Sequence, residues 1–220
     1  MKIFIGHDSF QAQNTEVCIA SIRKYNKNIE IIPIVKSEME RDYGFNREND
    51  GSTEFTYTRF LVPYICRYQG IALFCDSDFV WLCDPEEILG YYDDRNAVSC
   101  VQHNKMPVRS KEKMQGQVNE SYPRKWWSSL MLFNCEHQFC RRLNPDSINQ
   151  LSAQSLHRMH WAAHGIGELP VEYNYLVGYY DNDIFPKALH FTDGTPLYES
   201  YRNEPYADKY LEFIRDTELR

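Results

Sequence analysis

A chain of 220 residues with 43% hydrophobic residues can bury the core of one ordinary domain, and we expect residues 1–220 to form a single domain. A net charge of −7 excludes the clustered basic surface that general nucleic-acid binding needs. No stretch approaches the roughly 20 apolar residues that span a bilayer, so no transmembrane segment is predicted.

Strands and helices are predicted to alternate along the chain, which favours an α/β fold. Apolar runs predict strands at 2–6, 29–35, 71–75, 97–102, 128–134 and 187–191. Helical spacing predicts helices at 15–25, 55–68, 145–158 and 206–219, and Asp84-Pro85-Glu86-Glu87 marks the start of another. Pro63 is expected to kink or split the second helix. The polar segment 36–54 is expected to be a loop, and so is the longer basic segment 103–127.

The cysteines and the N-terminus favour a cytoplasmic protein. The seven cysteines are odd in number, lack C-x-x-C spacing and mostly fall in apolar runs, which predicts buried free thiols in a reducing compartment. The first residues, MKIFIGHDSF, contain one basic residue and too short an apolar run for a signal peptide. They predict the first strand instead.

The predicted strand 71–75 ends directly in Asp76-Ser77-Asp78. The two carboxylates stand at positions i and i+2, so an extended backbone points them to the same side. Like charges held together repel, and a divalent cation between them and a phosphate makes the arrangement favourable. In open α/β sheets, ligands bind beyond the carboxyl ends of the strands, where this triplet falls. A simple turn is the alternative, but the apolar runs on both sides favour a metal site.

Two further residues fit the same site. His190 lies in the predicted late strand 187–191 (KALHF), and its imidazole could be a third metal ligand. Arg59 lies in the largely apolar helix 55–68, and its guanidinium could pair with a diphosphate or with Asp76. Taken alone, His190 fits a buried structural histidine better, and Arg59 fits a solvated helix face about as well, so their value lies in the combination with the triplet.

The chain also contains an ordered series of short motifs that covers nearly its whole length. They are GHD at 6–8, TRFLVP at 58–63, IALFCDSDFVWLCDP at 71–85, WSSLMLFN at 127–134, LPVEYN at 169–174 and HFTDGTP at 190–196. Each motif is weak alone, but in this order the series resembles the nucleotide-sugar glycosyltransferases of the GT-A fold. The resemblance is nearest to glycosyltransferase family 8, the glycogenin and lipopolysaccharide galactosyltransferase group.

The resemblance implies a single GT-A, Rossmann-like α/β domain with a mostly parallel central sheet flanked by helices. It implies that Asp76, Asp78 and His190 hold Mn²⁺ or Mg²⁺ and that the donor is a nucleoside diphosphate sugar, in this family a UDP-sugar. The acceptor would be a carbohydrate or another hydroxyl compound, and the anomeric configuration would be retained. The other donor-binding residues that it implies are Gly6, His7, Asp8, Ser9, Arg59, Ser77, Ser128, Ser129, Asn174 and Gly194.

The chain departs from the family pattern in two places. The family's His-x-x-Gly-x-x-Lys-Pro reads here as His190-Phe-Thr-Asp-Gly194-Thr-Pro196, so the phosphate-binding lysine is absent. Lys187, a backbone amide, or a lysine or arginine of segment 103–127 is expected to serve instead. The acidic residue that faces the donor sugar has Glu168 as its nearest counterpart, which makes Glu168 a catalytic candidate beside Asp76, Asp78 and Arg59.

Two alternative functions stay open. A nucleotidyltransferase also uses paired carboxylates and Mg²⁺, but GHDSFQAQNT lacks the Gly-rich basic loop that usually follows its first strand. A sugar-nucleotide-binding protein without turnover would share the fold and the donor site. Segment 103–127 is either a lid that closes over the donor and excludes water or an ordinary mobile surface loop.

Overall fold

The computed structural model describes residues 1–48, 51–104, 108–113, 116–180 and 183–218 of the chain. Its strands are β1 (Lys2–Gly6), β2 (Glu30–Ile34), β3 (Ile71–Cys75), β4 (Phe79–Trp81), β5 (Val98–Cys100), β6 (Glu112–Lys113), β7 (Gln117–Val118), β8 (Leu130–Asn134), β9 (Ile166–Glu168), β10 (Tyr175–Leu176) and β11 (Ala188–His190). Its α-helices are α1 (Ala12–Tyr25), α2 (Lys36–Tyr43), α3 (Val62–Ile65), α4 (Pro145–Gln150), α5 (Ala153–His157) and α6 (Ala207–Glu218). Short 3₁₀ segments are η1 (Ser9–Gln11), η2 (Thr58–Leu61), η3 (Pro85–Tyr91), η4 (Trp127–Ser129), η5 (Cys140–Arg142), η6 (His160–Ala162), η7 (Val171–Asn174) and η8 (Glu199–Tyr201).

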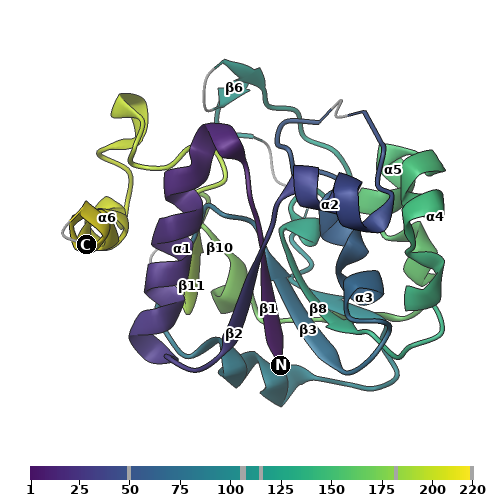
Figure 1. Ribbon diagram of the computed structural model, residues 1–220. Helices are drawn as coiled ribbons and strands as arrows, with labels where there is room; N and C mark the ends of the chain where they lie inside the picture. Colours follow the sequence, from purple (N-terminus) through teal and green to yellow (C-terminus); the bar gives the residue numbers. More distant parts are fainter. Residues whose placement is uncertain (49–50, 105–107, 114–115, 181–182, 219–220) are drawn as a thin grey trace.

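A six-stranded sheet with the order β2-β1-β3-β8-β5-β9 forms the centre of the molecule, with α1 on one side and α2 to α5 on the other (Figure 1). β8 runs antiparallel to both of its neighbours, and the other pairings are parallel. The predicted α/β fold with a mostly parallel central sheet is therefore confirmed. A second sheet, β10-β11-β4, lies beside it, and β6 pairs with β7 in a separate hairpin.

Both faces of the central sheet are buried, which explains why its strands are almost continuously apolar. Phe4 and Phe74 point to one face and pack in a core that includes residues of α2, η2 and α4. Ile5 and Leu73 point to the other face, where they pack with Ile22 of α1. The alternation of side chains along β1 and β3 thus fixes which helices cover which face.

The turn 76–78 carries the chain from the central sheet to the second sheet. β3 pairs with β1 and β8, whereas β4 pairs antiparallel with β11, so that Phe79 stands opposite His190. The second sheet is held from behind by a core of Val80, Leu189 and Tyr210 of α6. This register brings a residue from late in the sequence beside the Asp-Ser-Asp turn.

Several predicted boundaries are wrong for physical reasons. The expected loop 36–54 begins as helix α2, which buries Met39 and ends at Gly44 with a left-handed backbone, a common helix terminator. The expected helix 55–68 is instead η2 followed by a four-residue α3, with Pro63 in its first turn. The expected helix 145–158 is divided into α4 and α5, because Ser152 caps the second. Residues 49–50 and 219–220 of the predicted elements lie outside the described residues.

Segment 103–127 is not structureless where it is described. It contains the β6–β7 hairpin, and Gln117 Nε2 donates to the carbonyl of Ser52 at 3.1 Å. Arg109 forms a two-pronged ion pair with Glu204, at 2.9 and 3.0 Å. Residues 105–107 and 114–115 of the segment lie outside the described residues. These contacts with Ser52 and Glu204, which are distant in the sequence, anchor the described part of the segment.

The predicted free cysteines are confirmed, since all seven are free and five of them are buried. Within the described residues, no helix combines the length and the apolar character that crossing a bilayer requires.

The core under β3 should set the stability of the molecule. Phe74 is fully buried, so Phe74→Ala should lower the free energy of unfolding by about 3–5 kcal/mol, measured by urea denaturation. Phe185 is 88% exposed, and Phe185→Ala should change it by less than about 0.5 kcal/mol. Equal effects of the two substitutions would contradict the described core.

Candidate metal and donor site

Backbone hydrogen bonds fix both carboxylates of the triplet. The N–H of Asp76 donates to the carbonyl of Ser129 at 2.9 Å, which extends the β3–β8 pairing by one residue. The carbonyl of Asp78 accepts from the N–H of Phe191 at 3.0 Å, which ties the turn to the end of β11. The turn is therefore held between two sheets, and its side chains have little freedom.

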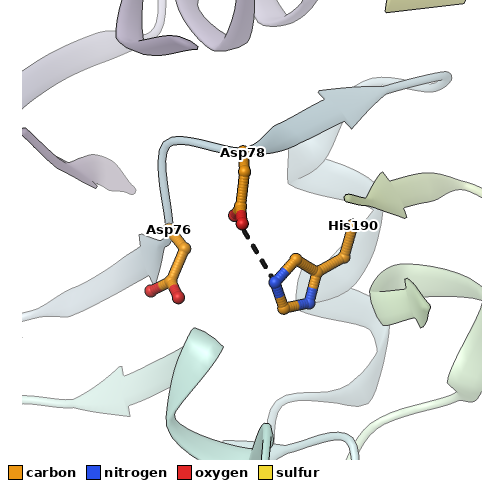
Figure 2. Close-up of side chains that lie close together, drawn as sticks. All are labelled: Asp76, Asp78 and His190. Carbon is orange, nitrogen blue, oxygen red and sulfur yellow. Dashed lines mark ion pairs between the residues drawn. The ribbon is translucent and has the colours of Figure 1, made fainter. Parts of the chain in front are cut away.

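Asp76, Asp78 and His190 converge on one point (Figure 2). One ligand atom from each lies within 4.8 Å of the other two. Asp78 Oδ1 is buried and accepts no hydrogen bond from the described residues; His190 Nε2 lies 3.4 Å from it. A buried carboxylate oxygen without a partner is costly, and a cation coordinated there would remove the cost. The residues present thus fit a divalent metal ion.

A chain of hydrogen bonds behind His190 sets the orientation of its ring. Ser129 Oγ donates to the carbonyl of Trp126 at 2.6 Å, and Asn174 Nδ2 donates to Ser129 Oγ at 2.9 Å. The remaining oxygen of the Asn174 amide then accepts from His190 Nδ1 at 2.8 Å. This assignment leaves a lone pair on Nε2, the nitrogen that faces Asp78. Metal-bound histidines usually have such a partner on their other nitrogen.

Arg59 pairs with Asp76, one of the two partners predicted for it. Its Nη1 lies 2.7 Å from Asp76 Oδ1 and also donates to the carbonyl of Ser128 at 2.9 Å. Both side chains are largely buried, and the ion pair holds one oxygen of Asp76. The other carboxylate oxygen remains for a cation.

The two carboxyl groups differ in acidity. Burial raises the pKa of Asp76 to about 6, although Arg59 opposes the rise. Burial also opposes ionisation of Asp78, but in the metal-free protein the positive charge of a protonated His190, together with that of Lys113, holds the pKa of Asp78 below its usual range. When two close carboxylates do not both ionise easily, a bound cation stabilises their charged forms, so this pattern is typical of a cation site.

A cavity of about 690 Å³ opens beside Asp76 and His190. Its volume is in the range of small-molecule sites. Its lining includes Lys113, Tyr122, Lys125 and Trp126 of segment 103–127 as well as His157 of α5. A recess of about 50 Å³ continues from it under the triplet and is also lined by Ser77. The arrangement can accommodate a polar, anionic ligand next to a metal ion.

The 3₁₀ segment η4, directly before β8, contributes two serines to this cavity. Ser128 Oγ forms a hydrogen bond of 2.8 Å with His157 Nδ1, whereas Ser129 Oγ belongs to the chain behind His190. Burial, and to a smaller extent Arg59 and Arg47, lower the pKa of His157 to about 3. His157 is therefore neutral at neutral pH and holds Ser128 at the cavity wall.

The donor-binding residues predicted at the end of β1, Gly6 to Ser9, lie at the same edge of the sheet but outside both cavities. Asp8 accepts from the N–H groups of Phe10 and Glu54, and Ser9 donates to Glu54 from both its N–H and its hydroxyl. A side chain at Gly6 would meet the ring of Phe55 at 2.3 Å. His7 Nδ1 lies 3.1 Å from Thr15 Oγ1. Segment 51–55 thus packs directly on this predicted cradle.

Three other predicted residues are not brought to the cavity. Asn174 lies behind His190, in the hydrogen-bond chain described above. The N–H of Gly194 donates to the carbonyl of Phe191, and the glycine faces Tyr201, whose ring a side chain would meet at 2.3 Å. Glu168 is exposed at the end of β9. The carboxylate that joins Asp76 in the cavity lining is Glu120.

The sequence did not single out His157, Tyr122 or Trp126, which all line the cavity. His157 ends a short helix whose pattern is that of an ordinary surface helix. Lys113 and Lys125 belong to the basic segment 103–127, but a sequence without a clear period cannot tell which of its cations face inward. No signal in the sequence would have selected them.

Solved structures with the same fold define the class of the domain: it has the GT-A fold of glycosyltransferases. The galactosyltransferase LgtC, solved with donor and acceptor sugar analogues, aligns with a TM-score of 0.62 and 13% identity over 98% of this chain and 96% of its own. GlyE of Streptococcus pneumoniae TIGR4 aligns with a TM-score of 0.63 and 13% identity over 96% of this chain. The bifunctional glycosyltransferase WbbM aligns with a TM-score of 0.61 and 16% identity over 97% of it. The chain spans 59% of GlyE and 49% of WbbM.

The family itself is shown by a plant protein. The chain is 37% identical over 219 residues to Protein CDI of Arabidopsis thaliana, an alignment that covers 96% of this chain and 84% of the relative. The chain belongs to the family of Protein CDI. No protein-family model matches it.

The hydrogen bond from His190 to Asn174 should matter for metal binding. Asn174→Ala frees the imidazole ring, so the affinity for Mn²⁺ should fall by about 10-fold or more, measured by isothermal titration calorimetry. Asn28 is exposed, and Asn28→Ala is the matched control that should bind as the wild type does. If Asn174→Ala also binds Mn²⁺ unchanged, the amide does not position His190.

Acid should weaken metal binding through Asp76. Its pKa of about 6 in the metal-free protein means that protons compete with the cation below this pH. The folded protein binds this proton more tightly than the unfolded chain does, so the metal-free protein loses stability as pH rises through this value. The increase in melting temperature caused by Mn²⁺ should therefore be larger at about pH 7.5 than at about pH 5. An equal increase at both values would contradict the assignment.

Proposed function

We propose that this protein is a metal-dependent glycosyltransferase that moves a sugar from a nucleoside diphosphate sugar, in the first place a UDP-sugar, to an acceptor hydroxyl. One observation carries the proposal. Asp76, Asp78 and His190 converge beside a cavity of about 690 Å³ at the carboxyl edge of a GT-A sheet. Ligand sites in open α/β folds occupy this edge.

The donor atoms of the site favour Mn²⁺ over Mg²⁺. Two carboxylates suit either ion, but Mg²⁺ strongly prefers oxygen, whereas the imidazole of His190 supplies nitrogen. When bound, such a cation binds the diphosphate oxygens and offsets the charge that develops as the bond to the sugar breaks.

The protein's own groups prepare the site for that step. Arg59 holds Asp76 in place, and the amide of Asn174 holds His190. Trp126 and Tyr122 form an aromatic wall of the cavity, which excludes water from one side of the donor. Because these groups are fixed before the donor binds, no reorganisation is needed as charge develops.

Two carboxylates are candidates for the acidic group that would face the donor sugar. Glu168 is the residue that the family resemblance suggests, and we retain it as a candidate although it lies outside the cavity. Glu120 lines the cavity and could accept the proton of the acceptor hydroxyl. Retention of configuration is part of the proposal because the family resemblance implies it; Ser128 and His157 line the cavity that would hold the donor.

The donor can be identified by a thermal-shift screen of nucleotide sugars with and without Mn²⁺. A ligand at 100 times its dissociation constant stabilises the folded state by about 2.7 kcal/mol, so the right donor should raise the melting temperature clearly, and only with Mn²⁺. Release of the nucleoside diphosphate from the selected donor then tests turnover. A protein that binds a donor but never releases nucleotide, whatever acceptor is offered, is a binding module and not an enzyme.

Asp78→Asn should abolish the Mn²⁺-dependent binding of UDP, because the substitution removes the charge of the buried ligand whose Oδ1 lacks a partner. Titration calorimetry with and without Mn²⁺ measures it. The exposed Asp42 on α2 offers a control, and Asp42→Asn should bind UDP normally. UDP affinity in Mn²⁺ that is the same for Asp78→Asn and the wild type would remove the basis of the proposal.

A further inference from the structure

Four cationic side chains among the described residues line the cavity, and they differ in whether a carboxylate already pairs with them. They are Arg59, Lys113, Lys125 and Arg158. Arg59 is committed to Asp76 and to the carbonyl of Ser128. Neither lysine has a carboxylate within ion-pair distance in the described part of the chain.

Lys125 is a buried cation held by neutral groups. Only 8% of it is exposed, and its Nζ donates at 2.5 Å to Asn119 Oδ1 and at 2.5 Å to the carbonyl of Glu120. An ammonium group has three N–H donors, so one donor remains. Burial, followed by the charge of Lys113, lowers the pKa of Lys125 to about 8. Two like charges thus lie near each other, and neither has a carboxylate in ion-pair contact among the described residues; Asp193 and Glu120 favour the charged form of Lys125 from a longer distance.

Lys113, at the end of β6, is close enough to interact electrostatically with Lys125 and with Asp76 and Asp78. It lines the large cavity and also the small recess that Asp76, Ser77 and Asp78 line. Its charge favours the ionised forms of both Asp76 and Asp78. An anion that contacts both the metal ion and Lys125 would therefore also lie near the charge of Lys113.

The hairpin that presents Lys113 is anchored and lies beyond the carboxyl ends of the central strands (Figure 1). Gln117 of β7 donates to the carbonyl of Ser52, a residue that lines both cavities. Asn119, which holds Lys125, donates to Asp193 Oδ1 at 3.1 Å, in the loop after β11. The two lysines are therefore positioned by contacts to both sides of the site.

We propose that Lys113 and Lys125 together bind the diphosphate of the donor, opposite the metal ion. This inference rests on the proposed function and adds the residues that take up the phosphate charge. Phosphate oxygens accept charge-assisted hydrogen bonds from ammonium groups, and an anion bound between them would relieve the repulsion of the two lysines. Lys187 is excluded from this role, because its Nζ bonds to Glu87 and Tyr173 and lines neither cavity.

The test compares Lys113→Met and Lys125→Met with the wild type in titrations of inorganic pyrophosphate and of UDP, both in the presence of Mn²⁺. Each substitution keeps the side-chain length and removes the charge. Each should therefore lower the affinity for both anions by about 10-fold or more. Lys111, exposed on the same segment and outside both cavities, provides the matched control; Lys111→Met should bind as the wild type does. The affinity for Mn²⁺ alone should be unchanged or higher in the lysine variants, because a nearby positive charge is removed.

The outcomes separate this inference from the proposed function. If the wild type binds Mn²⁺ but neither pyrophosphate nor UDP, both fail. If the wild type binds both anions and the two variants bind them equally well, the inference fails and the proposed function stands. Lys113 is only partly buried, so Lys113→Met decides the matter even if Lys125→Met does not fold. Lys113→Arg should restore most of the affinity, which a purely structural role for the side-chain stem would not require.

Discussion

The structure depends on the burial of two carboxylates at the turn between β3 and β4. Asp76 is matched by Arg59, whereas Asp78 keeps an oxygen without a hydrogen bond and a histidine beside it. Burying charge in this way is expensive, and the surrounding structure is arranged to make it tolerable. After the turn, β4 pairs with β11 in the second sheet, and this pairing places His190 beside the two carboxylates. The second sheet and α6 then hold β11 in place.

The hydrogen-bond chain from Trp126 to His190 orients the imidazole ring of His190 toward Asp78. Ser129 and Asn174 were both expected among the donor-binding residues; the structure joins their side chains to His190, and Ser129 also lines the cavity. The same few polar groups therefore link the 3₁₀ segments η4 and η7 to β11. Three motifs far apart in the sequence, at 127–134, 169–174 and 190–196, each contribute one member of this network.

The sequence was sufficient for the strands that form the site, because β1 and β3 are continuous apolar runs with abrupt polar ends. The end of β3 located the Asp-Ser-Asp turn, whereas the grouping of this turn with His190 of β11 was expected from the family resemblance. Helix α2 was missed because its solvated face dominates its composition and Met39 is its one buried residue. The inward-facing lysines could not be chosen from segment 103–127, since their direction is set by contacts of Gln117 and Asn119 with distant residues. Long-range contacts of this kind leave no local pattern.

The central claim is that the triplet and His190 form one metal site. Anomalous diffraction from crystals grown with Mn²⁺ tests it most directly, because the signal locates the ion without reference to any activity. The account predicts one strong peak within about 2.0–2.3 Å of a carboxylate oxygen of Asp76, of Asp78 Oδ1 and of His190 Nε2. A crystal that contains Mn²⁺ bound elsewhere, with His190 Nε2 still facing an empty position beside Asp78, would contradict it.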